Sequence, residues 1–273
     1  MSTHAGQLEG LFWRFPARLG AAVRQGLGRL GALSWFLYQC LWHGLRLRWY
    51  QAWVLLDVVR LQIKFTALDA LGLTCFAAFL MGGVTLLQVF SQMSAFGAVT
   101  YLSQWLAKLV IRELGPLMVA IIVIGRSGTA IAAEIASMKL QGEVDTLWAT
   151  GMNPIQYLLL PRIVAGIVSI FTLIVFFGSV ALLGGFFLAW LRLPLSWQAY
   201  LGSLGGVIGS RELGITALKS LVFGVSIPLI CVYCGLRVRE STTEIPQAVT
   251  KAAVYSLVVV LLGGALVSVL LYG

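Results

Sequence analysis

Charged residues are scarce in this 273-residue chain, and their scarcity excludes an ordinary soluble domain. Only 11% of the residues are charged and 59% are hydrophobic, whereas a soluble globular domain carries about 25% charged residues. The sequence therefore predicts an integral membrane protein. The glycine-rich phosphate loop G-x-x-x-x-G-K-[ST] is also missing, so the chain does not bind ATP by that device.

Residue types that carry out catalysis or bind metals are equally scarce. Histidine occurs only as His4 and His43, and no Ser/His/Asp or Cys/His constellation can be assembled from the sequence. Cys231 and Cys234 form a C-x-x-C pattern inside an apolar run, without the second pair or nearby His that a zinc site needs. We interpret both as packing residues, and we expect neither an enzyme activity nor a cofactor bound by the chain itself.

Apolar runs long enough to cross a membrane, which takes about 20 residues, occur five times. They cover residues 70–89, 114–138, 163–191, 213–236 and 252–272. Residues 91–113 also keep a helical period, which predicts a helix along or within the outer leaflet. The predicted fold class is an all-α integral membrane protein with five transmembrane helices and an N-terminal amphipathic interfacial helix.

The segment before the first span is basic and rich in tryptophan. Apolar residues recur every three or four positions from Phe12 to Leu33, and arginines lie between them on another face. This pattern is typical of a helix in the plane of the membrane interface, although a helix packed in the bundle is the alternative. We therefore divide the chain into an interfacial helical region, residues 1–66, and a five-span domain, residues 67–273.

Basic residues are distributed unequally over the two sides of the membrane, and this inequality predicts the orientation. Eight precede the first span, two lie in the connection 139–162 and three in 237–251, against four on the opposite side. We predict a cytoplasmic N-terminus and, after five crossings, a C-terminus on the other side. The positive charge favours anionic lipid at the cytoplasmic face over nucleic acid.

Ionisable residues inside the second span are candidates for function, because they are costly there. Arg126 and Glu134 lie eight positions apart and share a broad face of a helix without direct contact. One hypothesis is proton coupling in a secondary transporter. The alternative is that each pairs with a neighbouring helix and holds the bundle together. Glu113, beside Arg112 at the end of this span, is interpreted as half of an interfacial ion pair.

The connection between the second and third spans is predicted to contain a short amphipathic helix. Glu143 and Asp145 suit the positive end of its dipole, with Gly142 near its start and Gly151 at its end. A short helix between two turns can dock in a groove of a soluble partner. The pattern is equally consistent with an ordinary loop.

Four motifs follow one another in this central stretch: RELGP at 112–116, GRSGTAIAAEIASMK at 125–139, D-x-L-x-x-x-G-M-N-P at 145–154 and PRIVAG at 161–166. They resemble motifs of the MlaE/YrbE permeases, the membrane subunits of ABC transporters that move lipids between the inner and outer membranes. The resemblance covers residues 70–190 well, and AVTKAAVYS at 248–256 is similar in a weaker way.

The resemblance implies a homodimeric permease in the bacterial inner membrane that moves phospholipid or a related lipid through a cavity between the two copies. Its N-terminus would be cytoplasmic and its C-terminus periplasmic. The implied partners are a second copy, a cytoplasmic ABC ATPase dimer that carries ATP and Mg, a periplasmic Mce-domain protein and a small STAS-domain protein. Nucleic acid is not among them.

The resemblance also implies two groups of site residues and no catalytic or metal-binding residue. The lipid cavity is expected to include the glutamate of RELGP, and Met93 and Phe96 are added from their position and type alone. The expected cavity residues are Gln88, Met93, Phe96, Glu113 and Leu114. The coupling helix to the ATPase, near 141–150, and the turn after it contribute Glu143, Asp145, Leu147, Met152, Asn153 and Pro154.

The chain departs from the family pattern in its cytoplasmic connections. The coupling segment reads Gly142-Glu143-Val144-Asp145, where Glu-Gln followed by Ile-Asp is usual, and Asn153 replaces an Asp before the proline. The segment RVRESTTEIPQ at 237–247 replaces a glycine-rich stretch. These departures indicate a divergent branch. A membrane scaffold without transport is a third hypothesis, beside the ATP-driven permease and the secondary transporter.

Overall fold

The structure is a computed structural model, and all the elements that it describes are helices. It describes residues 49–95, 108–190, 198, 200, 209–239 and 241–272. Within these ranges there is no strand, so the predicted all-α class is confirmed. The interfacial helix predicted before residue 49 and residues 96–107 of the predicted outer-leaflet helix lie outside the described residues.

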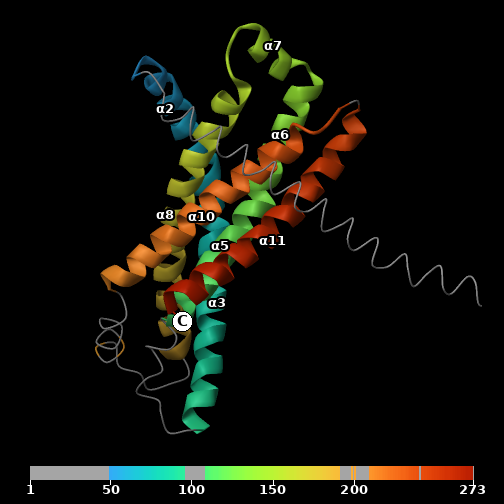
Figure 1. Cartoon of the computed structure of the whole chain (residues 1–273). Coiled ribbons are helices and arrows are strands. Elements are labelled where there is room, and N and C mark those ends of the chain that lie inside the picture. Colours follow the sequence, from blue (N-terminus) through green and yellow to red (C-terminus); the bar gives the residue numbers. More distant parts are fainter. Residues whose placement is uncertain are drawn as a thin grey trace, which may run out of the picture. The chain divides into compact units, whose positions relative to one another are not determined.

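The first span is one continuous helix that carries a π turn. It consists of α2 (Trp49–Ile63), η1 (Lys64–Leu68) and α3 (Asp69–Ala95) (Figure 1). Its apolar portion runs from Leu56 to Gln88. The predicted boundary between residues 66 and 67 therefore falls inside this helix, and the interfacial role of the preceding residues stays a prediction.

The second span contains two π turns, and both carry charged residues. Its elements in order are η3 (Val110–Leu114), α5 (Gly115–Val123), η4 (Ile124–Gly128) and α6 (Thr129–Leu140). Arg112 and Glu113 lie in η3, and Arg126 lies in η4. Because π turns are rare and are frequent at functional sites, their coincidence with the charges directs attention to these three residues.

The third span begins earlier than the sequence analysis predicted. Helix α8 runs from Pro154 to Trp190 rather than from residue 163. Pro154 takes the first helical position, where its missing N–H has no partner to lose, while Pro161 lies inside the helix. Arg162 is therefore part of the span, and its assignment to the cytoplasmic connection was wrong.

The fourth and fifth spans are α10 (Ser210–Gly235) and α11 (Ile245–Tyr272), and the short 3₁₀ turn η5 (Thr242–Glu244) precedes the last. The described part of the chain thus has five helices long and apolar enough to cross a membrane, as predicted. Helix α8 packs against α3 and α10, and α10 also packs against α6 and α11 (Figure 1).

The crossing of α8 and α10 depends on two glycines. A Cβ atom placed on Gly166 would lie 2.8 Å from the carbonyl oxygen of Gly224, and one on Gly224 would meet the backbone of Ile167. Small residues let helix backbones approach closely in a membrane, where packing replaces the hydrophobic effect as the force between helices. Larger side chains at these two positions would force the helices apart.

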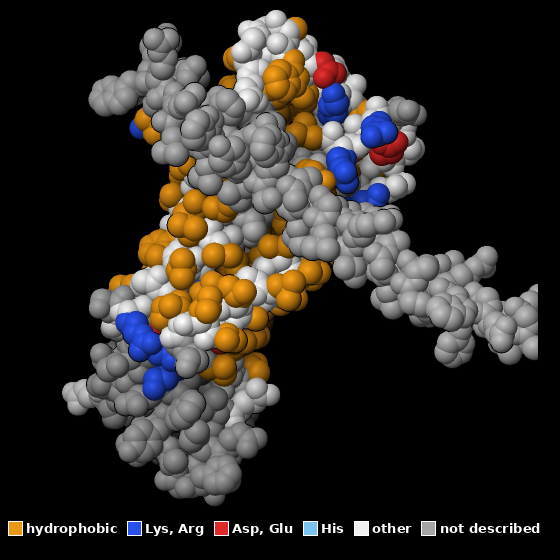
Figure 2. Space-filling model, viewed as in Figure 1, with side chains coloured by type: hydrophobic (Ala, Val, Ile, Leu, Met, Phe, Trp, Pro, Cys, Tyr) orange, Lys and Arg blue, Asp and Glu red, His pale blue; other side chains and the backbone are white. Residues whose placement is uncertain are grey.

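Apolar side chains cover much of the outside of the helices. Leu80 on α3, Leu183 on α8 and Leu262 on α11 are examples of large side chains that are exposed on the isolated chain. Figure 2 shows hydrophobic side chains along the helices and charged side chains gathered near their ends. Together with the five long apolar helices, this surface identifies a multi-pass membrane protein.

Candidate functional site

The connection between α6 and α8 is a defined helix bounded by two glycine turns. Helix α7 (Glu143–Ala149) follows Gly142 and precedes Gly151, and both glycines have φ of 77°. This left-handed conformation is strained for residues with a side chain. Glu143 and Asp145 lie in the first turn, where a negative charge favours the helix dipole. The predicted short helix is therefore confirmed.

One side of α7 is anchored and the other is exposed. Val144 is buried, and Lys139 at the end of α6 donates to Asp145 with an Nζ–Oδ1 distance of 2.8 Å. Trp148 exposes 58% of its surface, and Glu143 is exposed as well. An exposed tryptophan on a short helix is typical of a protein-binding face, where aromatic residues carry much of the energy.

The other predicted coupling residues have different environments. Met152 is exposed, Leu147 and Asn153 are half-buried, and Pro154 is buried at the start of α8. Pro154 is therefore a structural residue that fixes the beginning of the third span. Glu143, Asp145 and Met152 are the predicted residues that this chain leaves most accessible to a partner.

The intramembrane charges Arg126 and Glu134 each pair with a neighbouring helix. Arg126 Nη2 lies 3.5 Å from the Asp69 carboxylate on α3. Glu134 Oε2 lies 2.8 Å from Arg162 Nη2 on α8. This is the arrangement that the bundle-holding alternative predicts, since each charge is compensated from outside its own helix.

These charges also line a pocket of about 420 Å³ between the first and second spans. Phe65 and Ile131 contribute apolar surface, and Asp69, Arg126 and Glu134 contribute charge. The remaining described lining residues are Leu61, Gln62, Thr66, Ser127 and Ala130. The pocket therefore combines apolar walls with one guanidinium group and two carboxylates.

A second ionic group ties η3 to α10 and α11. Arg112 Nε donates to Glu212 Oε2 at 3.0 Å. Lys219 Nζ donates to Glu113 Oε1 at 3.2 Å and also to the carbonyl oxygen of Arg112, and Ser268 Oγ donates to Glu113 Oε1 at 2.7 Å. The interpretation of Arg112 and Glu113 as an end pair was therefore wrong. Adjacent residues of a helix point in different directions, and each finds its own partner on α10.

The structure describes the side chains of three of the five predicted cavity residues. Gln88 is exposed on α3, Leu114 is half-buried, and Glu113 belongs to the ionic group just described. Met93 lies in α3, and Phe96 lies outside the described residues. Their shared role in a lipid cavity stays a prediction.

Sequence reasoning did not assign roles to Lys219, Glu212, Asp69 and Arg162. A usable signal existed for two of them: Glu212 and Lys219 are seven positions apart, which is about two helical turns, so they lie on one face. That face could have been matched to the adjacent pair Arg112 and Glu113. Asp69 and Arg162 lie next to the apolar runs, where the sequence does not mark helix ends sharply.

The packing interpretation of the C-x-x-C pattern agrees with the position of its cysteines. Cys231 and Cys234 are both buried in α10. Cys231 Sγ lies 3.8 Å from Ser256 Oγ on α11. Free cysteines behave as small apolar residues with a weak S–H donor, which is the role that this contact supports.

Comparison with known proteins gives a consistent result. The family model described as Permease MlaE matches residues 59–270. A probable ABC transporter permease protein of Rickettsia typhi is 30% identical over 217 residues, which cover 80% of this chain and 84% of that protein. The intermembrane phospholipid transport system permease protein MlaE of Haemophilus influenzae is 27% identical over 206 residues, covering 73% and 77%. The chloroplastic protein TRIGALACTOSYLDIACYLGLYCEROL 1 of Arabidopsis thaliana is 27% identical over 197 residues, covering 72% and 56%.

Proposed function

Because the chain belongs to the MlaE permease family, we propose that it is the membrane subunit of an ATP-driven transporter for phospholipid or a related lipid. The similarity to a phospholipid transport permease of Haemophilus influenzae supports this substrate class. In this proposal two copies form the lipid path. A cytoplasmic ABC ATPase dimer binds ATP and Mg, and a periplasmic Mce-domain protein and a small STAS-domain protein complete the complex.

The observation that carries the proposal is the geometry of α7. This helix lies at one end of the spans (Figure 1), is held between two glycine turns and exposes Trp148 and Glu143. Its base is fixed to α6 by the Lys139–Asp145 ion pair. A short helix joined directly to two spans can transmit a displacement from a docked ATPase to α6 and α8, which is what a coupling helix must do.

The proposed orientation is supported by basic residues at the same end of the molecule. Lys139, Arg237, Arg239 and Lys251 gather where α6 and α10 end and α11 begins. A concentration of basic residues is typical of the cytoplasmic side. The proposal therefore places α7 in the cytoplasm, the N-terminus on the same side, and the C-terminus in the periplasm of a bacterial inner membrane.

The transport step is governed by burial of acyl chains. Each buried CH₂ group is worth about 0.8 kcal/mol, so a lipid leaves the bilayer only into another apolar space. We assign this space to a cavity between two copies that includes Gln88, Met93, Phe96, Glu113 and Leu114. Glu113 supports the assignment, because its side chain is 39% exposed although Lys219, its partner, is only 2% exposed. ATP-driven movement of α7 would switch the cavity between two conformations. The change in lipid affinity is then the difference between the lipid-binding free energies of these two conformations.

The decisive experiment is purification of the tagged chain from its native host, with the ATPase activity of the eluate as the measurement. The double variant Glu143→Lys/Trp148→Ala should lower the co-purified ATPase roughly tenfold or more, because aromatic residues at the centre of an interface are frequent hot spots. The matched control is Gln247→Lys, which adds a positive charge at an exposed position in the first turn of α11 and should leave the ATPase unchanged.

Two results would contradict the proposal at different levels. Wild-type retention of the ATPase by the double variant would reject α7 as the coupling helix. A wild-type chain that purifies without any ATPase and without lipid would reject the transporter itself.

A further inference from the structure

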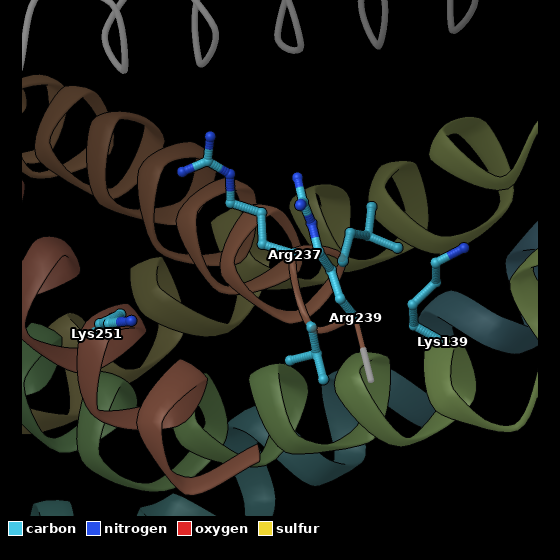
Figure 3. A pocket seen from close by; sticks show the side chains of 6 residues that line it. Lys139, Arg237, Arg239 and Lys251 are labelled. Atoms are coloured by element: carbon cyan, nitrogen blue, oxygen red, sulfur yellow. The ribbon is translucent and has the colours of Figure 1, made fainter. Parts of the chain in front are cut away.

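A pocket of about 560 Å³ lies where α6 and α10 end and α11 begins. Its described lining residues are four cationic side chains and two apolar ones, namely Lys139, Arg237, Arg239, Lys251, Leu236 and Val238. Figure 3 shows the four cations distributed around it. The volume is in the range of roughly 300–1,000 Å³ that small-molecule sites occupy. The function proposed above uses these cations for the orientation but assigns the pocket no ligand.

The backbone around the pocket is held by local contacts. Val238 is buried against Ala136 and Ala248, with Leu140 and Ile245 beside them. The backbone N–H of Arg239 donates to Glu244 Oε2 at 2.9 Å. The guanidinium carbon of Arg237 lies 4.9 Å from the centre of the Tyr233 ring. The turn after α10 therefore has a defined course, and it presents two arginines to the same opening.

Three of the four cationic side chains in the pocket form no ion pair with a described carboxylate. Lys139 pairs with Asp145, but the described residues include no carboxylate in an ion pair with Arg237, Arg239 or Lys251. All three are exposed, so an anion can reach them. Three exposed cations around one opening, with the Glu244 carboxylate held on the backbone N–H of Arg239, attract an anion with more than one acceptor oxygen.

Phosphate is the anion that these side chains suit best. Arginine presents a planar fork of donors that matches two phosphate oxygens, and lysine adds a point charge. Leu236, which follows directly after the end of α10, and Val238 offer apolar surface beside the charges. Basic pockets between transmembrane helices on the cytoplasmic side commonly bind lipid head groups. The place of the pocket at the ends of spans favours a lipid over a soluble phosphate compound.

We propose that this pocket binds the phosphate group of an anionic phospholipid from the cytoplasmic leaflet, as a resident lipid distinct from the transported one. The proposal rests on the orientation given under the proposed function. It also accounts for the segment 237–247, where the chain departs from the family pattern. The replacement of a glycine-rich stretch by RVRESTTEIPQ supplies both arginines of the pocket.

The test uses the full chain with its ATPase in nanodiscs of phosphatidylcholine that contain a photoactivatable phosphatidylglycerol. Cross-linked peptides are located by mass spectrometry. Label is expected in the peptides that carry Leu236 to Arg239 and Lys251, and unlabelled phosphatidylglycerol should compete with it. The triple variant R237Q/R239Q/K251Q should lower the label at least tenfold, since each cation near an anionic surface contributes about fivefold.

Two further variants separate a pocket from a diffuse charged surface. Arg60→Gln removes an exposed arginine of α2 outside the pocket, and its label should equal that of the wild type. Leu236→Trp keeps every charge but fills the apolar part of the pocket, and it should lower the label several-fold. If Leu236→Trp labels like the wild type, or if Arg60→Gln loses label as the triple variant does, this pocket is not the site that binds the lipid.

The remaining outcomes identify a different occupant or a different failure. Competition by inorganic phosphate as strong as that by phosphatidylglycerol would overturn the lipid in favour of a soluble anion. Label that appears only when the ATPase is omitted would overturn it in favour of a protein contact. Unchanged label in the triple variant, with the ATPase still bound, would reject this site alone, whereas a wild-type chain without ATPase would reject the proposed function.

Discussion

Two ionic groups within the spans differ in how far their cationic side chains are buried. In the group at η3, Lys219 is 2% exposed and has a carboxylate and a backbone carbonyl as acceptors. In the group at η4, Arg126 and Asp69 are 42% and 40% exposed and lie 3.5 Å apart. The first group closes a contact between helices. The second lines a pocket and leaves its charges accessible.

The difference shows how a charge can be tolerated in a membrane protein. A buried ammonium group is stable only when its partners are in place, so the loss of one partner is costly. An accessible charge is hydrated or bound by a ligand, so its local ion pair contributes little. We therefore expect substitutions in the η3 group to change stability most, whatever their effect on the lipid cavity, and substitutions in the η4 group to change ligand retention with little effect on stability.

The largest effect is expected for Glu113→Ala. This substitution removes the carboxylate that accepts from Lys219 and Ser268 and leaves Lys219 buried with a backbone carbonyl as its acceptor. We expect a loss of about 3 kcal/mol in unfolding free energy, at the low end for a broken buried pair because Glu113 is partly exposed. Thermal unfolding in detergent, followed by far-UV circular dichroism, measures it.

The control for this prediction removes both charges. The double variant Glu113→Ala/Lys219→Met leaves no buried ammonium group, and it should regain most of the lost stability, because apolar replacement of a buried pair is often neutral. A double variant that unfolds as early as Glu113→Ala would show that the buried charge is not the cause.

An intermediate effect is expected for Glu134→Ala, because this pair combines the two environments. Arg162 is 8% exposed and Glu134 is 55% exposed. Removal of Glu134 leaves the buried guanidinium donating to the Leu158 carbonyl at 2.7 Å, without a carboxylate from Glu134, at a cost of about 2 kcal/mol. The reverse substitution Arg162→Met leaves an accessible carboxylate and should cost less, below about 1 kcal/mol. Equal midpoints of chemical unfolding for the two variants would contradict this asymmetry.

The sequence predicts some of these features well, because their signals are local. Runs of apolar residues mark the spans, and Gly142 and Gly151 mark both ends of α7. The sequence does not predict which residues pair with the charges inside the spans. Lys219 and Glu113 are 106 positions apart, and only the packing of α10 against η3 joins them. Arg162 was assigned to the connection because the apolar run begins only at residue 163. Helix α8 nevertheless continues through Pro161, since a proline inside a helix can be accommodated when neighbouring helices support it.

The smallest effect on stability, and the sharpest test of the comparison, is expected for Arg126→Ala. Its pair with Asp69 is long and accessible, so the unfolding free energy should change by about 1 kcal/mol or less. The lipid that co-purifies with the complex, quantified by mass spectrometry, should fall, because the pocket loses its only guanidinium group among the described lining residues. Lys64→Ala, an exposed lysine of η1 outside that lining, should leave both quantities unchanged. If Arg126→Ala instead unfolds like Glu113→Ala and keeps its lipid, the η4 group is a helix contact of the same kind as the η3 group. The π turn at Arg126 would then serve the packing of the second span rather than a ligand.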